Sequence, residues 1–172
     1  MRTGNRLRRP LPAGVSLVEA MLSLVIVAVM LTAALTTVGG GRLSQYKTCL
    51  STRGMALAEG LMAEILQQPY QDPNAPILFG PEAGESTATR RDFDDVDDYN
   101  GWTSSPPVQK DGSPVPGTTG WRQTVTVQWV DPADPTSVAS VESHVKRITV
   151  RVLFGDMEVA VLTALKTSAD AP

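Results

Sequence analysis

The clearest pattern along this chain is an apolar run near its N-terminus. Between Val15 and Val38 the only ionisable side chain is that of Glu19. A helix over residues 15–38, rising about 1.5 Å per residue, reaches about 36 Å, which is enough to cross the hydrocarbon core of a bilayer. The run is longer than the apolar core of an ordinary secretory signal, which is usually about 7 to 15 residues. We therefore predict a membrane-spanning helix here.

A second helical pattern follows the apolar run, over residues 39–67. It opens with three glycines, 39–41, each of which weakens a helix by roughly 1 kcal/mol relative to alanine, so we expect a loosened stretch there. Beyond the glycines, apolar residues recur at three, four or seven positions, as on one face of a helix: Leu43, Tyr46, Leu50, Leu57, Leu61 and Ile65. Cys49 and Met62 lie near this stripe and are predicted to be core side chains, and the helix is expected to end before Pro69.

Residues 68–120 show no sustained period and are rich in Pro, Gly, Asp, Ser and Thr. This composition predicts a long loop region. A loop of that length in a compact domain needs anchors. Phe93, Tyr99 and Trp102 are the apolar side chains that we expect to fix it to a core.

Residues 121–166 have the alternation of β-strands. Apolar and polar residues alternate from Trp121 to Trp129 and again around Ile148 to Phe154, and Gly155-Asp156 forms a two-residue turn into a further apolar strand. One apolar sheet face needs a cover, which the second helical stripe supplies. The fold class predicted is therefore α+β, a long helix on an antiparallel sheet of three or four strands, followed by a tail at 167–172.

Charge separates the first 14 residues from the rest of the chain. Residues 1–14 hold four arginines and no acid, which predicts a cytoplasmic N-terminus and an exported C-terminal head. Without those arginines, 11 basic residues face 18 acidic ones, a formal charge of −7. A nucleic-acid partner is therefore not expected, because such surfaces need clustered lysine and arginine. Cys49 is the single cysteine, so no intramolecular disulfide can form.

The residues around the start of the apolar run form a motif. They read Gly14, Val15, Ser16, Leu17, Val18, Glu19, then a continuous apolar stretch. The motif resembles that of the type IV prepilin family, whose members have a short basic leader ending in Gly and a Glu at the fifth mature position. The resemblance implies cleavage of a leader, residues 1–14, between Gly14 and Val15 by a prepilin peptidase, which also N-methylates Val15. The family usually has Phe where this chain has Val15, a departure that bears on methylation. A plain uncleaved signal anchor has the same hydropathy.

Glu19 needs a partner or a purpose, because a carboxylate in hydrocarbon costs roughly 2.5 to 3.5 kcal/mol. Cleavage creates an amino group at Val15, and a cation beside a carboxylate lowers the cost of both charges. The resemblance implies that Glu19 of one subunit meets the Val15 amine of its neighbour and sets the axial register. The alternative is that Glu19 pairs within its own chain or reaches the headgroups.

The family resemblance also implies an assembly function. The chain would be a structural subunit, a minor pilin or pseudopilin, of a type IV pilus-like or type II secretion filament. Its partners would be the peptidase, other subunits, an inner-membrane assembly platform and, before assembly, membrane lipid. It would span the inner membrane once, with a periplasmic head. Two stretches, the start Ser16-Leu17-Val18-Glu19 and the segment from Ala56 to Leu66, look like those of I-type minor pseudopilins of type II secretion or V-type minor pilins. A minor pilin head for adhesion or DNA uptake is an alternative.

The strongest polar feature of the head is a run of five aspartates in seven residues: Asp92, Asp94, Asp95, Asp97 and Asp98. Calcium takes six to eight oxygen ligands, so this loop is a candidate calcium site, although it does not match an EF-hand. Some members of the type IV prepilin family bind calcium in loops beside the sheet. The alternative is a solvated turn whose aspartates accept hydrogen bonds from local backbone amides.

Catalytic signals are few, and we expect no enzyme and no cofactor besides the candidate calcium. His144 is the only histidine, and no nucleophile elbow, phosphate-binding loop or dinucleotide fingerprint is present. A membrane-anchored, metal-dependent hydrolase using the aspartate loop is the alternative from another functional class. Arg147 and Arg151, with Lys146 nearby, predict a solvated sheet face or a weak anionic contact.

Overall fold

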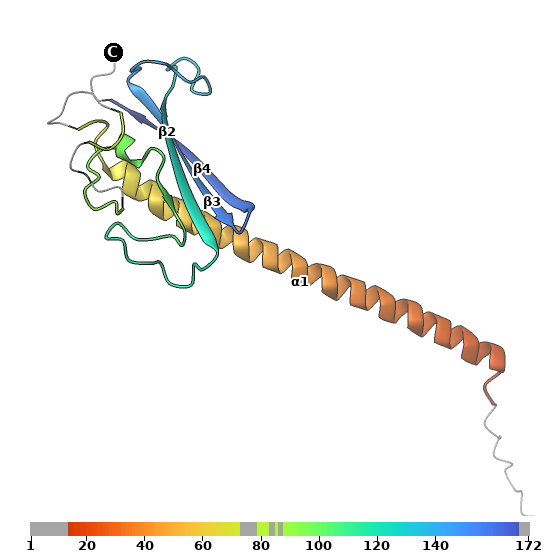
Figure 1. Ribbon diagram of the computed structural model, residues 1–172. Helices are drawn as coiled ribbons and strands as arrows, with labels where there is room; N and C mark the ends of the chain where they lie inside the picture. Colours follow the sequence, from red (N-terminus) through yellow and green to blue (C-terminus); the bar gives the residue numbers. More distant parts are fainter. Residues whose placement is uncertain (1–13, 73–78, 83–84, 86–87, 169–172) are drawn as a thin grey trace, which may run out of the picture. The chain divides into compact units, whose positions relative to one another are not determined.

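A computed structural model describes residues 14–72, 79–82, 85 and 88–168 (Figure 1). The chain divides into two compact units, Met1–Tyr46 and Lys47–Pro172, which are described separately below. The predicted leader except Gly14, and residues 169–172 of the predicted tail, lie outside the described residues.

One helix, α1 (Leu17–Gln67), contains both predicted helical segments. The glycines at 39–41 do not interrupt it, so the expected loosening is not seen as a break in the helix. The helix ends at Gln67, because the residue before Pro69 is disfavoured from helical backbone angles.

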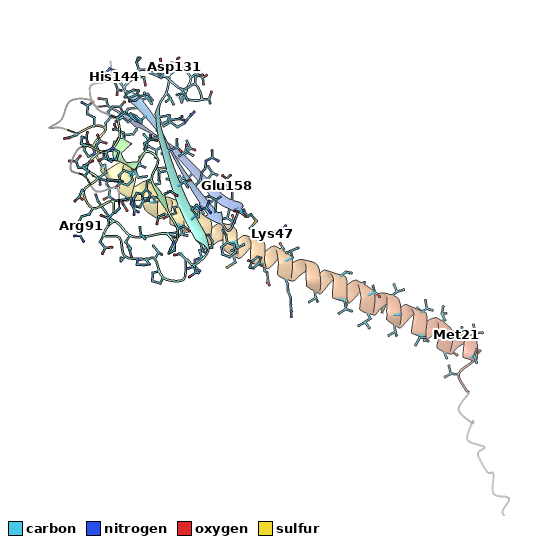
Figure 2. The ribbon with its side chains drawn as sticks, viewed as in Figure 1. Met21, Lys47, Arg91, Asp131, His144 and Glu158 are labelled. Carbon is cyan, nitrogen blue, oxygen red and sulfur yellow. The ribbon has the colours of Figure 1, made fainter. Side chains whose placement is uncertain are left out.

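The described part of the N-terminal unit, residues 14–46, contains the apolar part of α1. An 18-residue window has a mean hydropathy of 2.4 and no buried residue. Large apolar side chains such as Leu24 and Met30 are 73% and 68% exposed, and Figure 2 shows Met21 projecting freely from the helix. In the described part of the chain, α1 is the one helix long and apolar enough to cross a membrane, which is consistent with a single-pass membrane anchor.

The second unit is built on a four-stranded antiparallel sheet in the order β1-β2-β3-β4. Its strands are β1 (Thr103–Ser104), β2 (Trp121–Trp129), β3 (Val145–Phe154) and β4 (Met157–Thr167). The alternation predicted for residues 121–166 is confirmed, and Gly155-Asp156 joins β3 to β4 as the two-residue turn. Strand β1 and the short 3-10 helix η1 (Asp97–Tyr99) lie within the predicted loop region, where they are too short to give a periodic signal.

The core of this unit lies between the sheet and α1 from residue 50 onward. Figure 1 shows β2, β3 and β4 alongside this part of the helix. The buried helix residues are Leu50, Gly54, Ala58, Leu61, Met62 and Ile65. Met62 is thus a core side chain as predicted. The prediction was wrong for Leu43 and Tyr46, which are more than half exposed, and for Cys49, which is also exposed.

Small residues on α1 allow a close approach to the sheet. A Cβ atom at Gly54 would lie 2.7 Å from Cγ2 of Val159 and 3.3 Å from Cβ of Ala160, both on β4. The amide Nε2 of Gln123 on β2 donates to the carbonyl oxygen of Leu57 at 2.9 Å. The helix and the sheet can therefore lie close together because Gly54 has no side chain, and the hydrogen bond from Gln123 joins them.

Three aromatic side chains fix the long loop to the core, as predicted. Phe93, Tyr99 and Trp102 are all buried, and the Phe93 ring makes edge contacts with the other two, with centroids 5.0 and 5.8 Å apart. The buried Arg90 donates from Nε to Oε1 of Glu64 at 2.8 Å and from a terminal nitrogen to Oε2 at 2.9 Å. This two-bond pair ties the loop to α1 as well.

Candidate functional site

The predicted processing motif lies at the start of α1. Gly14, Val15 and Ser16 are exposed and precede the first helical residue, Leu17. The carbonyl oxygen of Ser16 accepts the first helical hydrogen bond, from the amide of Ala20 at 3.0 Å. The backbone between Gly14 and Val15 is therefore exposed and outside the helical hydrogen-bond ladder.

Glu19 is in the first turn of α1 and is exposed. A carboxylate at this position interacts favourably with the positive end of the helix dipole. None of the ion pairs within the described residues includes Glu19. The helix neighbours three and four positions on are Leu22 and Ser23, neither of which carries a charge.

Three threonines of the apolar segment have their hydroxyl groups satisfied within the helix itself. The hydroxyl groups of Thr32, Thr36 and Thr37 donate to backbone carbonyl oxygens three or four residues earlier, at 2.7 to 2.9 Å. In hydrocarbon, an unpaired polar group costs several kcal/mol, so these bonds make the threonines compatible with lipid. Glu19 is the ionisable exception within this segment.

The structure does not bring the five aspartates of the acidic loop together. Asp92 and Asp94 are exposed, whereas Asp95, Asp97 and Asp98 are at most 3% exposed. Oδ2 of Asp98 accepts from the amides of Asp94 and Asp95 at 2.9 and 3.0 Å, and Oδ1 of Asp95 accepts from the amide of Asp97 at 2.7 Å. Part of the loop is thus organised by aspartates that bond local backbone amides.

Asp97 pairs with Lys146, a residue that the sequence analysis had grouped with the surface arginines. Its carboxylate forms an ion pair with Nζ of Lys146, and the same ammonium donates to the carbonyl oxygen of Tyr70. Lys146 is buried, because it has the same parity on β3 as Ile148 and therefore points to the inner face of the sheet. The expectation that Lys146 accompanies the surface arginines was wrong.

Two glutamates that the sequence analysis did not single out lie next to Asp98. Carboxylate oxygens of Glu82, Glu85 and Asp98 all lie within 4.8 Å of one another. Burial, followed by the charge of Asp98, raises the pKa of Glu82, and burial raises the pKa of Glu85 to about 7. Burial also raises the pKa of Asp95 to about 8, with the hydrogen bond to Asp97 as the next cause. The only sequence signal for this cluster was two acids upstream of the aspartate run.

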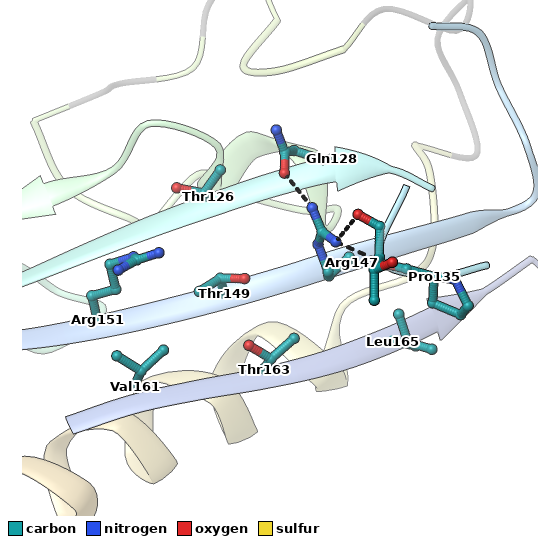
Figure 3. Close-up of a pocket in the computed structure, with 10 residues that line it drawn as sticks. Thr126, Gln128, Pro135, Arg147, Thr149, Arg151, Val161, Thr163 and Leu165 are labelled. Carbon is teal, nitrogen blue, oxygen red and sulfur yellow. Dashed lines mark hydrogen bonds between the residues drawn. The ribbon is translucent and has the colours of Figure 1, made fainter. Parts of the chain in front are cut away.

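The outer face of the sheet carries a trough of about 510 Å³ (Figure 3). Arg147 donates to the carbonyl oxygens of Pro135 and Thr136 at 2.9 and 3.0 Å and to Oε1 of Gln128 at 2.9 Å. Arg151 pairs with Glu158 at 2.9 Å, and both of these side chains are about half exposed. The two arginines are therefore engaged by neighbours of their own chain on a solvated sheet face.

His144 is an exposed residue directly before β3. Its backbone has a φ of 60°, and its amide donates to Oε1 of Glu142 at 2.7 Å. It is far along the chain from the acidic loop and from the N-terminal motif.

The comparisons with known proteins add no further assignment: no family model, no curated protein and no solved structure matches this chain.

Proposed function

We propose that this protein is a pilin-like assembly subunit, cut between Gly14 and Val15, whose apolar helix first holds it in a membrane and then enters the core of a filament. The observation that carries the proposal is Glu19. It is the lone ionisable group of an otherwise uncharged, fully exposed helical segment, five residues after a glycine that ends a basic leader.

The electrostatics of the helix start support this proposal. Cleavage after Gly14 would turn the exposed, non-helical Val15 into an amino terminus, one turn of chain from the carboxylate of Glu19. In a bundle of parallel helices surrounded by apolar side chains, that carboxylate needs a cation, and the amine of an adjoining subunit supplies one. Each such pair would fix the axial position of one subunit against the next.

The head fits an assembly function better than turnover. A hydrolase using the aspartate loop would need carboxylates open to substrate, whereas Asp95, Asp97 and Asp98 are buried and bonded to amides or to Lys146. We assign the protein to the minor pilins or pseudopilins. Before assembly it would span the inner membrane once, with the arginine-rich end in the cytoplasm and the head outside it.

Mass spectrometry of the mature N-terminus tests the proposal. In cells with an active prepilin peptidase, we expect a chain that begins at Val15, with or without an N-methyl group. Gly14→Leu should retain the leader, because the peptidase is expected to need glycine before the cut. Gly4→Leu, a matched change within the leader, should be processed normally. An intact leader on the wild-type protein beside a processed control prepilin would overturn the proposal.

A further inference from the structure

We propose that Glu82, Glu85 and Asp98 form a calcium-binding site in the head. Their carboxylate oxygens lie within 4.8 Å of one another. Two oxygens that both bind one calcium ion at 2.3–2.6 Å can be separated by up to about 5 Å, so all three carboxylates can reach a common ion. This inference concerns the folded head alone and does not depend on the assembly function proposed above.

Asp98 gives independent support, because it is a deeply buried carboxylate with an oxygen left over. The residue is 1% exposed, and its Oδ2 is held by the amides of Asp94 and Asp95. Its Oδ1 is buried and accepts no hydrogen bond from the described residues, and the same is true of Oε2 of Glu82. Buried carboxylate oxygens without a donor are costly, and a bound cation would satisfy both.

The charges around the cluster are unbalanced. Asp72, Asp94, Asp95 and Asp97 add further acids in the same region. The two lysines nearby are committed elsewhere: Lys110 donates to the carbonyl oxygen of Phe93, and Lys146 pairs with Asp97. No ion pair within the described residues includes Glu82, Glu85 or Asp98. A divalent ion would supply the positive charge that the side chains do not.

The donor set selects the class of ion. Three carboxylates and no nitrogen or sulfur ligand favour a hard cation, and calcium tolerates irregular geometry, with backbone carbonyl groups or water in the remaining positions. A cavity of about 170 Å³ lies beside Asp98 and is lined also by Pro81 and Gly101, but not by either glutamate. The ion would link Glu82 and Glu85 to η1, and through Tyr99 and Glu64 to α1.

Calcium binding to the full-length protein in detergent tests the site. Titration calorimetry with calcium chloride should show one saturable site, with a dissociation constant on the order of 10⁻⁴ to 10⁻³ M, as in extracellular calcium modules. With 10 mM calcium, the thermal midpoint of the head should rise by roughly 3–8 °C. Absence of saturable binding up to 10 mM would overturn the proposal.

Charge-matched variants separate a defined site from general acidity. Glu82→Gln/Glu85→Gln should weaken calcium binding at least tenfold and remove the thermal shift. Asp92→Asn/Asp156→Asn removes the same charge from exposed positions outside the cluster and should retain both. Far-ultraviolet circular dichroism checks the fold, and Glu85→Gln alone serves if the double variant is unfolded. Equal losses in the two double variants would contradict the assignment.

Discussion

At the scale of single residues, the head depends on a few buried charges rather than on its surface pairs. Lys146 and Asp97 are both nearly inaccessible and pair with each other, whereas Arg151 and Glu158 pair on the solvated face. A buried charge that loses its partner is strongly destabilising, but an exposed pair contributes about 0–1 kcal/mol. The pair at Lys146 should therefore be essential for folding and the pair at Arg151 dispensable.

Replacing Lys146 by methionine tests this difference. Lys146→Met leaves Asp97 buried without its cation, and we expect the free energy of unfolding to fall by about 3–5 kcal/mol. Arg151→Met, the same change on the same strand, should cost about 0–1 kcal/mol. Denaturant unfolding of the full-length protein in detergent, followed by tryptophan fluorescence, measures both. Equal effects of the two substitutions would contradict the importance of the buried pair.

At Lys146 the sequence prediction was wrong, although the alternation along β3 held the information needed to place this side chain. The parity of β3 already placed Lys146 with Ile148, Val150 and Val152, so its inward direction was readable, although its partner was not. Asp97 follows an irregular loop, and nothing in the spacing of residues shows which strand such a loop will approach. The contact of Glu82 and Glu85 with Asp98 was hidden for the same reason.

At the scale of elements, the helix and the sheet approach each other closely at Gly54. Apolar stripes of large residues predicted α1 and its packing face, but the buried face begins only at Leu50 and includes Gly54 and Ala58. Small residues carry little weight in a hydrophobic pattern, yet they decide how near two elements can come. Strand β1 was also not predicted, because its two residues are too few to show the apolar and polar alternation of a strand.

Two glycine substitutions on α1 test that packing. Gly54→Ala would place a methyl group 2.7 Å from Cγ2 of Val159, so we expect a loss of about 1–3 kcal/mol in the free energy of unfolding. Gly60→Ala, on the same helix with nothing within 4 Å of its added Cβ, should stabilise the protein by about 0.5–1 kcal/mol. Thermal unfolding measures both signs, and stabilisation by Gly54→Ala would show that the contact is looser than described.

At the scale of the whole molecule, an exposed helical segment whose one charged side chain is that of Glu19 is joined in sequence to an acidic head. The α+β class, the helix from the apolar run to Gln67 and the strands from Trp121 onward were predictable, because long periodic segments carry strong signals. Residues 68–120 were predictable only as a loop with aromatic anchors. The assembly function remains a proposal that depends on the order of a few residues, Gly14, Val15 and Glu19.

Incorporation of Glu19→Gln into filaments provides the most direct test. The variant removes one charge, keeps the shape of the side chain and leaves the leader intact. Purified filaments from cells that express either form would be compared by quantitative mass spectrometry, with Glu59→Gln on the exposed face of the same helix as the control. We expect incorporation of Glu19→Gln to fall by about tenfold or more, which corresponds to at least 1.4 kcal/mol, and that of Glu59→Gln to be unchanged. Wild-type incorporation of Glu19→Gln would contradict the pairing of this carboxylate with a subunit amine.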